Sequence, residues 1–385
     1  MGSWQVRLYS PLPEAEPLLD APLSWSQIGD ITETLTGFES ASLQGETTIE
    51  PEPGRRLRVE RIPDMGGAYQ AFGHAEIDYG SVPVFEGRMT RPMRSPFGEP
   101  TGAQLLGYPS ALTDTVVLSD DETVYAHDDL IKRLVQRHAP LFEAGQIEPV
   151  GGQLRLVDVH TQTPYVVLDG IAKQGDEQGN PLVWRVQPGR RIDLVIAAEP
   201  DVAEVQLDVD PKHVTRWDEE PEWIISEALV RYQNTDTGQD ATEPADGLPK
   251  RNPYLSETWP LSRMAVLEGG ALRPIGAKRF LDTYLRVHSR PSVNVELTFA
   301  VDEPVMLYPG GLVPAYAVPC GLWISVGGQG PWQLTKRTIR VAQGETVLTV
   351  GTLETGIDVF RRLRTNDALR AARVNVITGS RERTG

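Results

Sequence analysis

The sequence has very little cysteine and lysine. Among its 385 residues there is one cysteine, Cys320, and there are only six lysines beside 31 arginines. A single cysteine cannot form a disulfide within the chain, which fits a protein that folds in a reducing cytoplasm. The excess of arginine suits interfaces, because the guanidinium group makes planar two-point contacts, but a GC-rich genome also explains it.

Long apolar runs are absent as well. No stretch of about 18 consecutive apolar residues occurs, so the sequence predicts no membrane-spanning helix. The first residues, MGSWQVRLYSPLPEAEP, lack the basic start and apolar core of a secretory signal, and we expect none. Hydrophobic content of 40% and charged content of 23% are typical of a folded soluble protein. The length favours two or three domains over one.

Strong catalytic and metal-binding motifs are also missing. There is no HExxH motif, no cysteine pair, no G-x-S-x-G elbow, no Walker A loop and no complete G-x-G-x-x-G, and GGQGPW at 327–332 is only a glycine-rich turn. We therefore predict no catalytic, cofactor-binding or metal-binding residue, and no cofactor. The six histidines are scattered over the chain: His74, His127, His138, His160, His213 and His288.

Clusters of acidic residues are the one enzyme-like feature. DVDP at 208–211 and DEEPEW at 218–223 could supply a paired acid and base, and Trp217 and Trp223 could stack on a sugar. With 53 acidic residues in the chain such clusters also arise by chance, and a run of acids is usually a solvated loop. The glycan interpretation requires both tryptophans and the carboxylates of 218–222 to meet in one cleft.

The net charge is −16 at neutral pH. Phosphate binding depends on lysine and arginine replacing counterions, so this charge argues against a surface that grips nucleic acid. It allows a surface past which DNA slides without sticking. The alternative is that the acidity serves only solubility, and the sequence does not separate the two.

The sequence predicts a mainly β fold with an α/β insertion, in four segments. Residues 1–118 carry short β-type runs separated by Pro, Gly and acidic clusters, typical of an antiparallel barrel or sandwich. Residues 119–202 form a small α/β module, and residues 203–365 return to β texture, including TYLRVHS at 283–289. Within 203–365, the polar stretch 234–253 predicts an exposed loop, and residues 366–385 predict a tail.

Two helices and a hairpin define the α/β module. YAHDDLIKRLVQRHAP predicts a helix with Leu130, Ile131, Leu134 and Val135 on one face, Asp128 and Asp129 at its start, and Pro140 as its stop. TPYVVLDGIAKQG predicts a second helix with a Thr163 cap, Pro164 at the first position and Gly175 at its end. NPLVWRV and RRIDLVIA, separated by QPG, predict a β-hairpin.

The order of these segments resembles the tail hub proteins of phages and related injection machines, the late-control-D-like family. In that family an apolar strand ending in Gly is followed by a loop, a strand ending in a small and an aromatic residue, and then a leucine and an acid. The resemblance covers most of residues 30–365, although residues 4–25 are richer in Pro and acid than the family pattern. The matching segments are Val84-Phe85-Glu86-Gly87, Leu106-Gly107-Tyr108, Leu112-Thr113-Asp114, and residues 125–136, 163–176, 181–195, 230–238 and 344–363.

The resemblance implies a homotrimer in which each chain contributes two barrel modules. Six barrels would then match a sixfold tail tube above to a threefold tip below, and the ring would line the DNA passage at the tail tip of a virion assembled in the host cytoplasm. Strands 84–94 and 103–108 would form a barrel hairpin, with Gly87 at a bulge or bend and Pro92 where no ladder donor is needed. The turn 95–102 and the loop 234–253 would contact neighbouring subunits or rings.

This interpretation predicts tube or distal-ring proteins above, spike or fibre proteins below, no membrane insertion, no enzyme activity, and wide flat surfaces without a cleft. Two alternatives stay open. One is a glycan-binding or glycan-hydrolysing β-sandwich protein, and the other is a sixfold distal tail adaptor ring.

Overall fold

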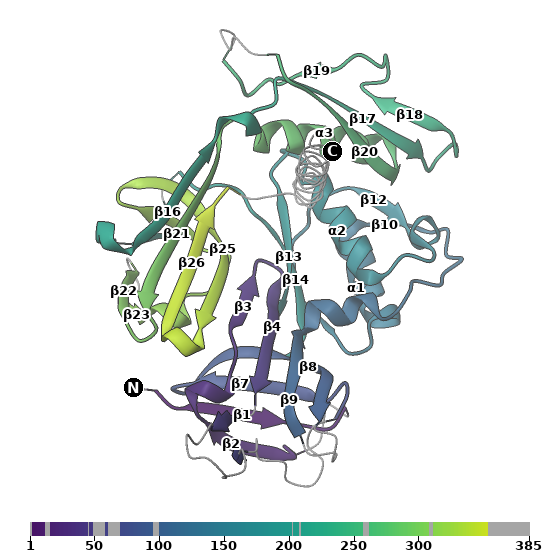
Figure 1. Ribbon diagram of the computed structural model, residues 1–385. Helices are drawn as coiled ribbons and strands as arrows, with labels where there is room; N and C mark the ends of the chain where they lie inside the picture. The colour runs from purple at the N-terminus through teal and green to yellow at the C-terminus, as the bar shows by residue number, and fades with distance from the viewer. Residues whose placement is uncertain are drawn as a thin grey trace, which may run out of the picture.

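A computed structural model describes residues 2–11, 16–44, 46–48, 58–60, 70–94, 100–201, 203–207, 209–256, 262–307 and 311–352. The described chain is mainly β, as the sequence predicts, with three α-helices (Figure 1). The helices are α1 His127–His138, α2 Pro164–Gln174 and α3 Pro274–Val287. Short 3-10 turns are Trp25–Gln27, Tyr108–Thr113, Leu156–Val159, Pro211–His213, Pro221–Trp223, Ala315–Ala317 and Val341–Gln343.

Half of the described strands belong to one sheet of 13 strands. They are β1 Trp4–Leu8, β2 Leu19–Leu23, β3 Ile31–Thr34, β4 Gly37–Gln44, β7 His74–Tyr79, β8 Val82–Arg94, β9 Pro100–Gly107, β15 Val205–Leu207, β16 Val214–Glu220, β21 Ser292–Ala300, β24 Trp323–Val326, β25 Gln329–Arg340 and β26 Glu345–Gly351. The smaller sheets hold β5 Glu46–Thr48 with β6 Arg58–Glu60; β10 Val124–Ala126 with β12 Gln153–Arg155; β11 Glu143–Ile147, β13 Leu182–Gln187 and β14 Arg191–Ile196; β17 Glu227–Asn234, β18 Asp240–Glu243, β19 Lys250–Arg251 and β20 Met264–Leu272; and β22 Pro304–Leu307 with β23 Gly311–Pro314.

The first β-rich unit contains the predicted hairpin, as β8 paired antiparallel with β9. Gly87 does not sit at a bulge, because the register shifts between these strands fall at Met89/Arg91 and Met93/Arg94. A β-carbon at Gly87 would overlap the carbonyl oxygen of Leu106, so glycine permits close approach of the two backbones here. Pro92 lies beyond the part of β8 that pairs with β7, in a stretch bonded to β9 on one side.

The predicted helices and hairpin of the α/β unit are confirmed. Leu130, Ile131, Leu134 and Val135 of α1 are buried, and both aspartates lie in its first turn. In α2 the Thr163 side chain accepts a hydrogen bond from the Val166 amide at 3.4 Å, and the helix ends at Gly175, whose φ of 70° few other residues adopt. Strands β13 and β14 pair antiparallel around the Pro-Gly turn.

The two β-rich units are joined within the main sheet, a connection that the sequence did not indicate. Strand β3 of the first unit pairs antiparallel with β25 of the last, and β3 in turn pairs with β4. The pairing joins segments about 300 residues apart, and β3 is only four residues long, so local periodicity does not identify it. In Figure 1 the first unit lies at the bottom, the second at the left, and β13 and β14 stand in the centre, between the second unit and helices α1 and α2.

Residues 283–289, expected as strand, belong to helix α3 and the turn that follows it. The helix begins with Pro274 at its first position and buries Ala277, Phe280, Leu281, Tyr284 and Leu285, the spacing of a helical face. TYLRVHS by itself shows apolar alternation that is equally compatible with a strand. Helix α3 covers one face of the sheet of β17, β18 and β20 (Figure 1), and this unit has its own apolar core.

The stretch 234–253, expected as a loop, contains strands β18 and β19, both paired with β17. Most of its side chains are nevertheless exposed. Other segments named in the sequence predictions lie outside the described residues: positions 95–99 of the turn 95–102, positions 353–363 of the segment 344–363, and the tail 366–385.

Candidate functional site

Acids 218–220 lie on an edge strand and not in a solvated loop. They belong to β16, which pairs with β21 and ends the order of strands in the main sheet. Glu219 and Glu220 are exposed, and Asp218 forms an ion pair with Arg216 at 2.5 Å. Trp217 on the same strand is 40% exposed and meets Trp332 edge to face, with ring centroids 5.3 Å apart.

Trp223 lies elsewhere, in the interior. It is buried, and its ring packs on His288 with centroids 4.3 Å apart. His288 Nδ1 lies 2.9 Å from the carbonyl oxygen of Trp223, which ties the 3-10 turn of 221–223 to the end of α3. The two tryptophans and the carboxylates therefore do not meet in one cleft, as the glycan interpretation requires.

A different cleft is present, about 530 Å³ in volume, where the α/β unit, the α3 unit and the second β-rich unit meet. The expectation of surfaces without a cleft is therefore wrong. The walls of this cleft come from segments far apart in the sequence, so no local sequence pattern indicates the cleft. The lining residues are Asn180, Pro181, Ala197, Glu199, Pro200, Asp201, Glu219, Arg286, Val287, Arg290, Pro291, Val293, Trp323, Pro331, Trp332, Gly351 and Thr352.

The charged side chains around this cleft are only partly paired with one another. Arg290 Nη1 donates to Glu199 at 2.9 Å, and a second guanidinium nitrogen contacts the other carboxylate oxygen. Arg290 is exposed, and this two-point contact matches its charge with that of Glu199. Asp201 and Glu219 are exposed, and neither forms an ion pair with a described side chain. The lining holds no serine, cysteine or histidine that could act as a nucleophile or be activated as one.

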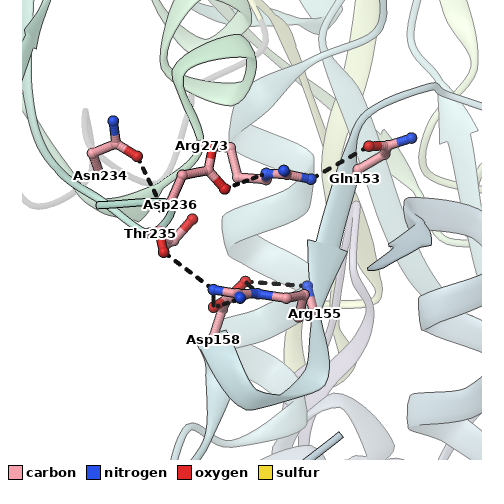
Figure 2. A network of polar contacts seen from close by, with 7 residues as sticks. All are labelled: Gln153, Arg155, Asp158, Asn234, Thr235, Asp236 and Arg273. Carbon is pink, nitrogen blue, oxygen red and sulfur yellow. Dashed lines mark hydrogen bonds and ion pairs between the residues drawn. The ribbon is translucent and has the colours of Figure 1, made fainter. Parts of the chain in front are cut away.

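A polar joint connects the α/β unit to the α3 unit, through Gln153, Arg155, Asp158, Thr235, Asp236 and Arg273 (Figure 2). Arg155 pairs with Asp158 at 2.7 Å and donates to the carbonyl oxygen of Thr235 at 3.1 Å, across from the α/β unit to the turn after β17. Arg273, at the start of α3, pairs with Asp236 at 3.0 Å and donates to Gln153 at 3.3 Å. Arg155 thus reaches from β12 to the α3 unit, and Arg273 reaches from the α3 unit back to β12.

A buried ion pair supports the junction between the two β-rich units. Arg337 of β25 is 5% exposed and lies 2.5 Å from Glu33 of β3. Its guanidinium also donates to the carbonyl oxygens of Tyr316 at 2.6 Å and Val318 at 3.1 Å, so the buried cation has several partners. Burial raises the pKa of Glu33, and Arg337 acts against that shift.

The sole cysteine and the histidines occupy separate structural positions. Burial raises the pKa of the Cys320 thiol, which keeps it protonated and unreactive. His74 contacts Tyr108 at 2.6 Å and Glu76 at 3.1 Å, and its hydrogen bond lowers the pKa of Glu76 to about 2. His213 pairs with Glu303 at 2.9 Å, and His160 contacts the backbone of Ser119.

Over the described ranges, no group of three or more His, Cys, Asp or Glu side chains is arranged to hold a metal ion. No helix in that part of the chain is both long and apolar enough to cross a membrane.

Comparison with known proteins finds similarity in structure and not in sequence. No protein-family model matches the chain, and no curated protein matches it. The 43 kDa tail protein of prophage MuSo2 from Shewanella oneidensis superimposes with a TM-score of 0.55 at 11% identity, over 90% of this chain and 98% of its own. A tail protein from Neisseria meningitidis gives 0.55 at 14% identity, over 90% and 96%. Prophage tail protein gp18 from Listeria monocytogenes gives 0.55 at 8% identity, over 94% and 98%. The chain therefore has the fold of phage tail proteins along nearly its whole length.

Proposed function

We propose that this protein is a structural hub of a phage tail tip or baseplate. In this role, three copies form a ring that joins the sixfold tail tube to a threefold tip and lines the DNA passage. The observation that carries the proposal is the coverage of the structural match, because 90–94% of this chain aligns with 96–98% of three phage tail proteins. The similarity between this chain and the three tail proteins thus extends over the whole arrangement of units and is not limited to one common module.

The open strand edges support a role in assembly. The described order of the main sheet ends at β16 on one side and at β2 on the other. Unpaired strand edges expose backbone donors and acceptors and invite pairing with another chain, and a ring covers them with the neighbouring subunit. For an obligate ring we expect an interface above roughly 2,000 Å² between adjacent copies, apolar at its centre.

The proposal is tested by native mass measurement of the purified full chain together with negative-stain images. We expect a species of three chains and a ring with threefold symmetry. A sixfold ring would instead identify a distal tail adaptor. A compact monomer, or a position on the outside of an assembled tail away from its axis, would overturn the hub proposal.

The proposed role is not enzymatic, and this part has its own test. Asp218→Asn, Glu219→Gln and Glu220→Gln together change exposed or half-exposed groups on β16, so the fold and the ring should persist. The wild-type chain should release no reducing ends from bacterial polysaccharides. Hydrolysis by the wild type that is lost in the triple variant would contradict a purely structural role.

A further inference from the structure

Strand β20 forms one edge of the sheet in the α3 unit. It pairs with β17 along the length of that strand, and β18 and β19 pair with the other side of β17. No strand of the described chain pairs with the second edge of β20. In Figure 1 this sheet lies at the top, at the end of the molecule opposite the first β-rich unit.

The edge of β20 is less protected than the two ends of the main sheet. Proteins protect unpaired edges with charged side chains, proline or short strands. β2 is five residues long and contains Asp20 and Pro22, and β16 carries three consecutive acids at 218–220. β20 is nine residues long, contains no proline, and has Glu268 as its one charged residue. Of these three edges, that of β20 is therefore the best suited to receive another strand.

Two glycines leave the backbone of β20 accessible. Gly269 lies at a shift in register with β17, between the residues that pair with Arg231 and Tyr232, and Gly270 has a φ of 69°. A β-carbon at Gly270 would meet no atom within 4 Å. Glycine in a strand marks a bulge or a site where another backbone approaches closely, and Gly270 leaves room for such an approach.

β20 borders an apolar hollow beside helix α2. This hollow measures about 290 Å³, and residues 268–272 of β20 form part of its lining. Most of its other lining side chains are apolar, and they include Val166 of α2, which is 50% exposed, and Phe280 of α3. Asp169 and Lys173 in the same lining form an ion pair with each other at 2.5 Å. The apolar hollow therefore suits apolar side chains of a partner.

The same part of β20 borders a polar hollow of about 980 Å³. Its charged lining residues are one cation and three anions: Arg231, Asp240, Glu243 and Glu268. Arg231 is the cross-strand neighbour of Glu268, and Glu243 lies near Lys250 and Lys278, but the exposed Asp240 forms no ion pair with a described side chain. Arg231 alternates along β17 with residues that pack on α3, so its side chain stands on the opposite face of the sheet. The polar hollow is thus acidic on balance and suits cationic side chains.

We propose that the edge of β20 binds an extended segment of another tail protein, in which apolar residues alternate with lysine or arginine. Alternate side chains of an added strand point to opposite faces of a sheet, so one set enters the apolar hollow and the other set the polar hollow. A second copy of this chain fits less well, because both ends of its main sheet carry acids and each copy has a net charge of −16. The inference rests on the proposed hub function only for the source of the strand, since its test does not depend on ring symmetry.

Peptide binding to the full chain tests the location. The probe is an octapeptide of four Lys-Val repeats, and the readout is hydrogen exchange of the amides of 264–272. With excess peptide, exchange there should slow by about tenfold, because a paired edge opens less often. A peptide of the same composition in block order, four lysines and then four valines, should leave exchange within about twofold of the free protein.

Equal protection by both peptides, or none by the alternating one, would overturn the proposal. Protection of these amides without peptide that disappears on dilution would assign the edge to a second copy, and it would also overturn the choice of partner.

Substitutions in the two hollows test the chemistry. Val166→Lys places a cation in the apolar hollow and Glu268→Lys reverses the exposed charge of β20, so each should weaken binding of the alternating peptide by about tenfold. Val116→Lys and Asp120→Lys make the same changes at exposed positions outside both hollows and should leave the affinity within about twofold of wild type. Equal losses in all four variants would assign binding to net charge and refute the site, as would unchanged binding in both hollow variants. A chain that binds the peptide at β20 but forms no threefold ring would instead overturn the hub function alone.

Discussion

Leu134 shows how a single side chain anchors the α/β unit. It is fully buried on α1, in a cluster that includes residues of α2 and of the β13–β14 hairpin. Leu134→Ala should lower the free energy of unfolding by about 2–4 kcal/mol, because it removes apolar contacts and leaves a cavity. Chemical denaturation with a fluorescence readout measures the change.

Val166→Ala serves as the matched control for this substitution. Val166 is 50% exposed on the neighbouring helix α2, so its truncation should change the free energy of unfolding by less than about 0.5 kcal/mol. An equally small effect for Leu134→Ala would show that the assigned buried face of α1 is wrong.

His127 makes the stability of the protein depend on pH. It is 1% exposed at the start of α1, and neither ring nitrogen has a hydrogen-bond partner among the described residues. Burial and the nearby Arg279 lower its pKa to about 4. The unfolded chain binds the proton near the ordinary pKa of about 6.5. Between these values the unfolded state holds more protons, so the His127 contribution is complete above pH 6.5 and is lost as pH falls towards 4.

We therefore expect His127→Gln to flatten the stability curve between pH 6.5 and 4, relative to wild type, when free energies of unfolding are measured at several pH values. His160→Gln changes an exposed histidine and should leave a curve parallel to that of the wild type. Parallel curves for both variants would show that His127 does not titrate differently in the folded and unfolded states.

At the scale of elements, the joint in Figure 2 determines how the α3 unit is held. Arg273 connects Asp236 in the turn after β17 with Gln153 in β12, so it restrains that turn from outside its own sheet. Arg273→Ala should increase hydrogen exchange of amides 234–239 about threefold to tenfold, because local opening of the turn then costs less. The exchange of α1 amides should not change.

Arg231→Ala is the control for the joint. Arg231 is an exposed arginine on β17 of the same unit, and it takes no part in the joint of Figure 2. Its removal should leave exchange at 234–239 unaltered, and equal increases in both variants would assign the effect to general destabilisation of the sheet.

At the scale of the whole molecule, the net charge of −16 should weaken any contact between the proposed ring and DNA. A ring around a DNA passage must let the duplex move, and an acidic surface repels phosphates. In a mobility-shift assay at about 50 mM salt, duplex DNA should run free at micromolar protein, since nonspecific binding needs cations that displace counterions. Tight, salt-sensitive retention of DNA would contradict a non-binding passage.

The sequence by itself determined the features that depend on neighbouring residues. Apolar spacing in 127–138, the Thr-Pro start at 163–164 and the Pro-Gly turn at 188–189 each specify a local conformation, and the structure contains all three. The order of these elements also sufficed to indicate the fold of phage tail proteins. The sequence predicts a strand at 283–289, whereas these residues end helix α3 and form the turn after it. So short an apolar alternation is compatible with the period of a strand and with that of a helix.

Tertiary structure alone decided which distant segments meet. The β3–β25 pairing, the buried Glu33–Arg337 ion pair and the cleft all join residues separated by more than 100 positions. Such contacts depend on the sum of packing over several units, and no local pattern in the sequence encodes them. For the same reason Trp217 and Trp223, six residues apart, ended in different surroundings, one exposed on an edge strand and one buried against the end of α3.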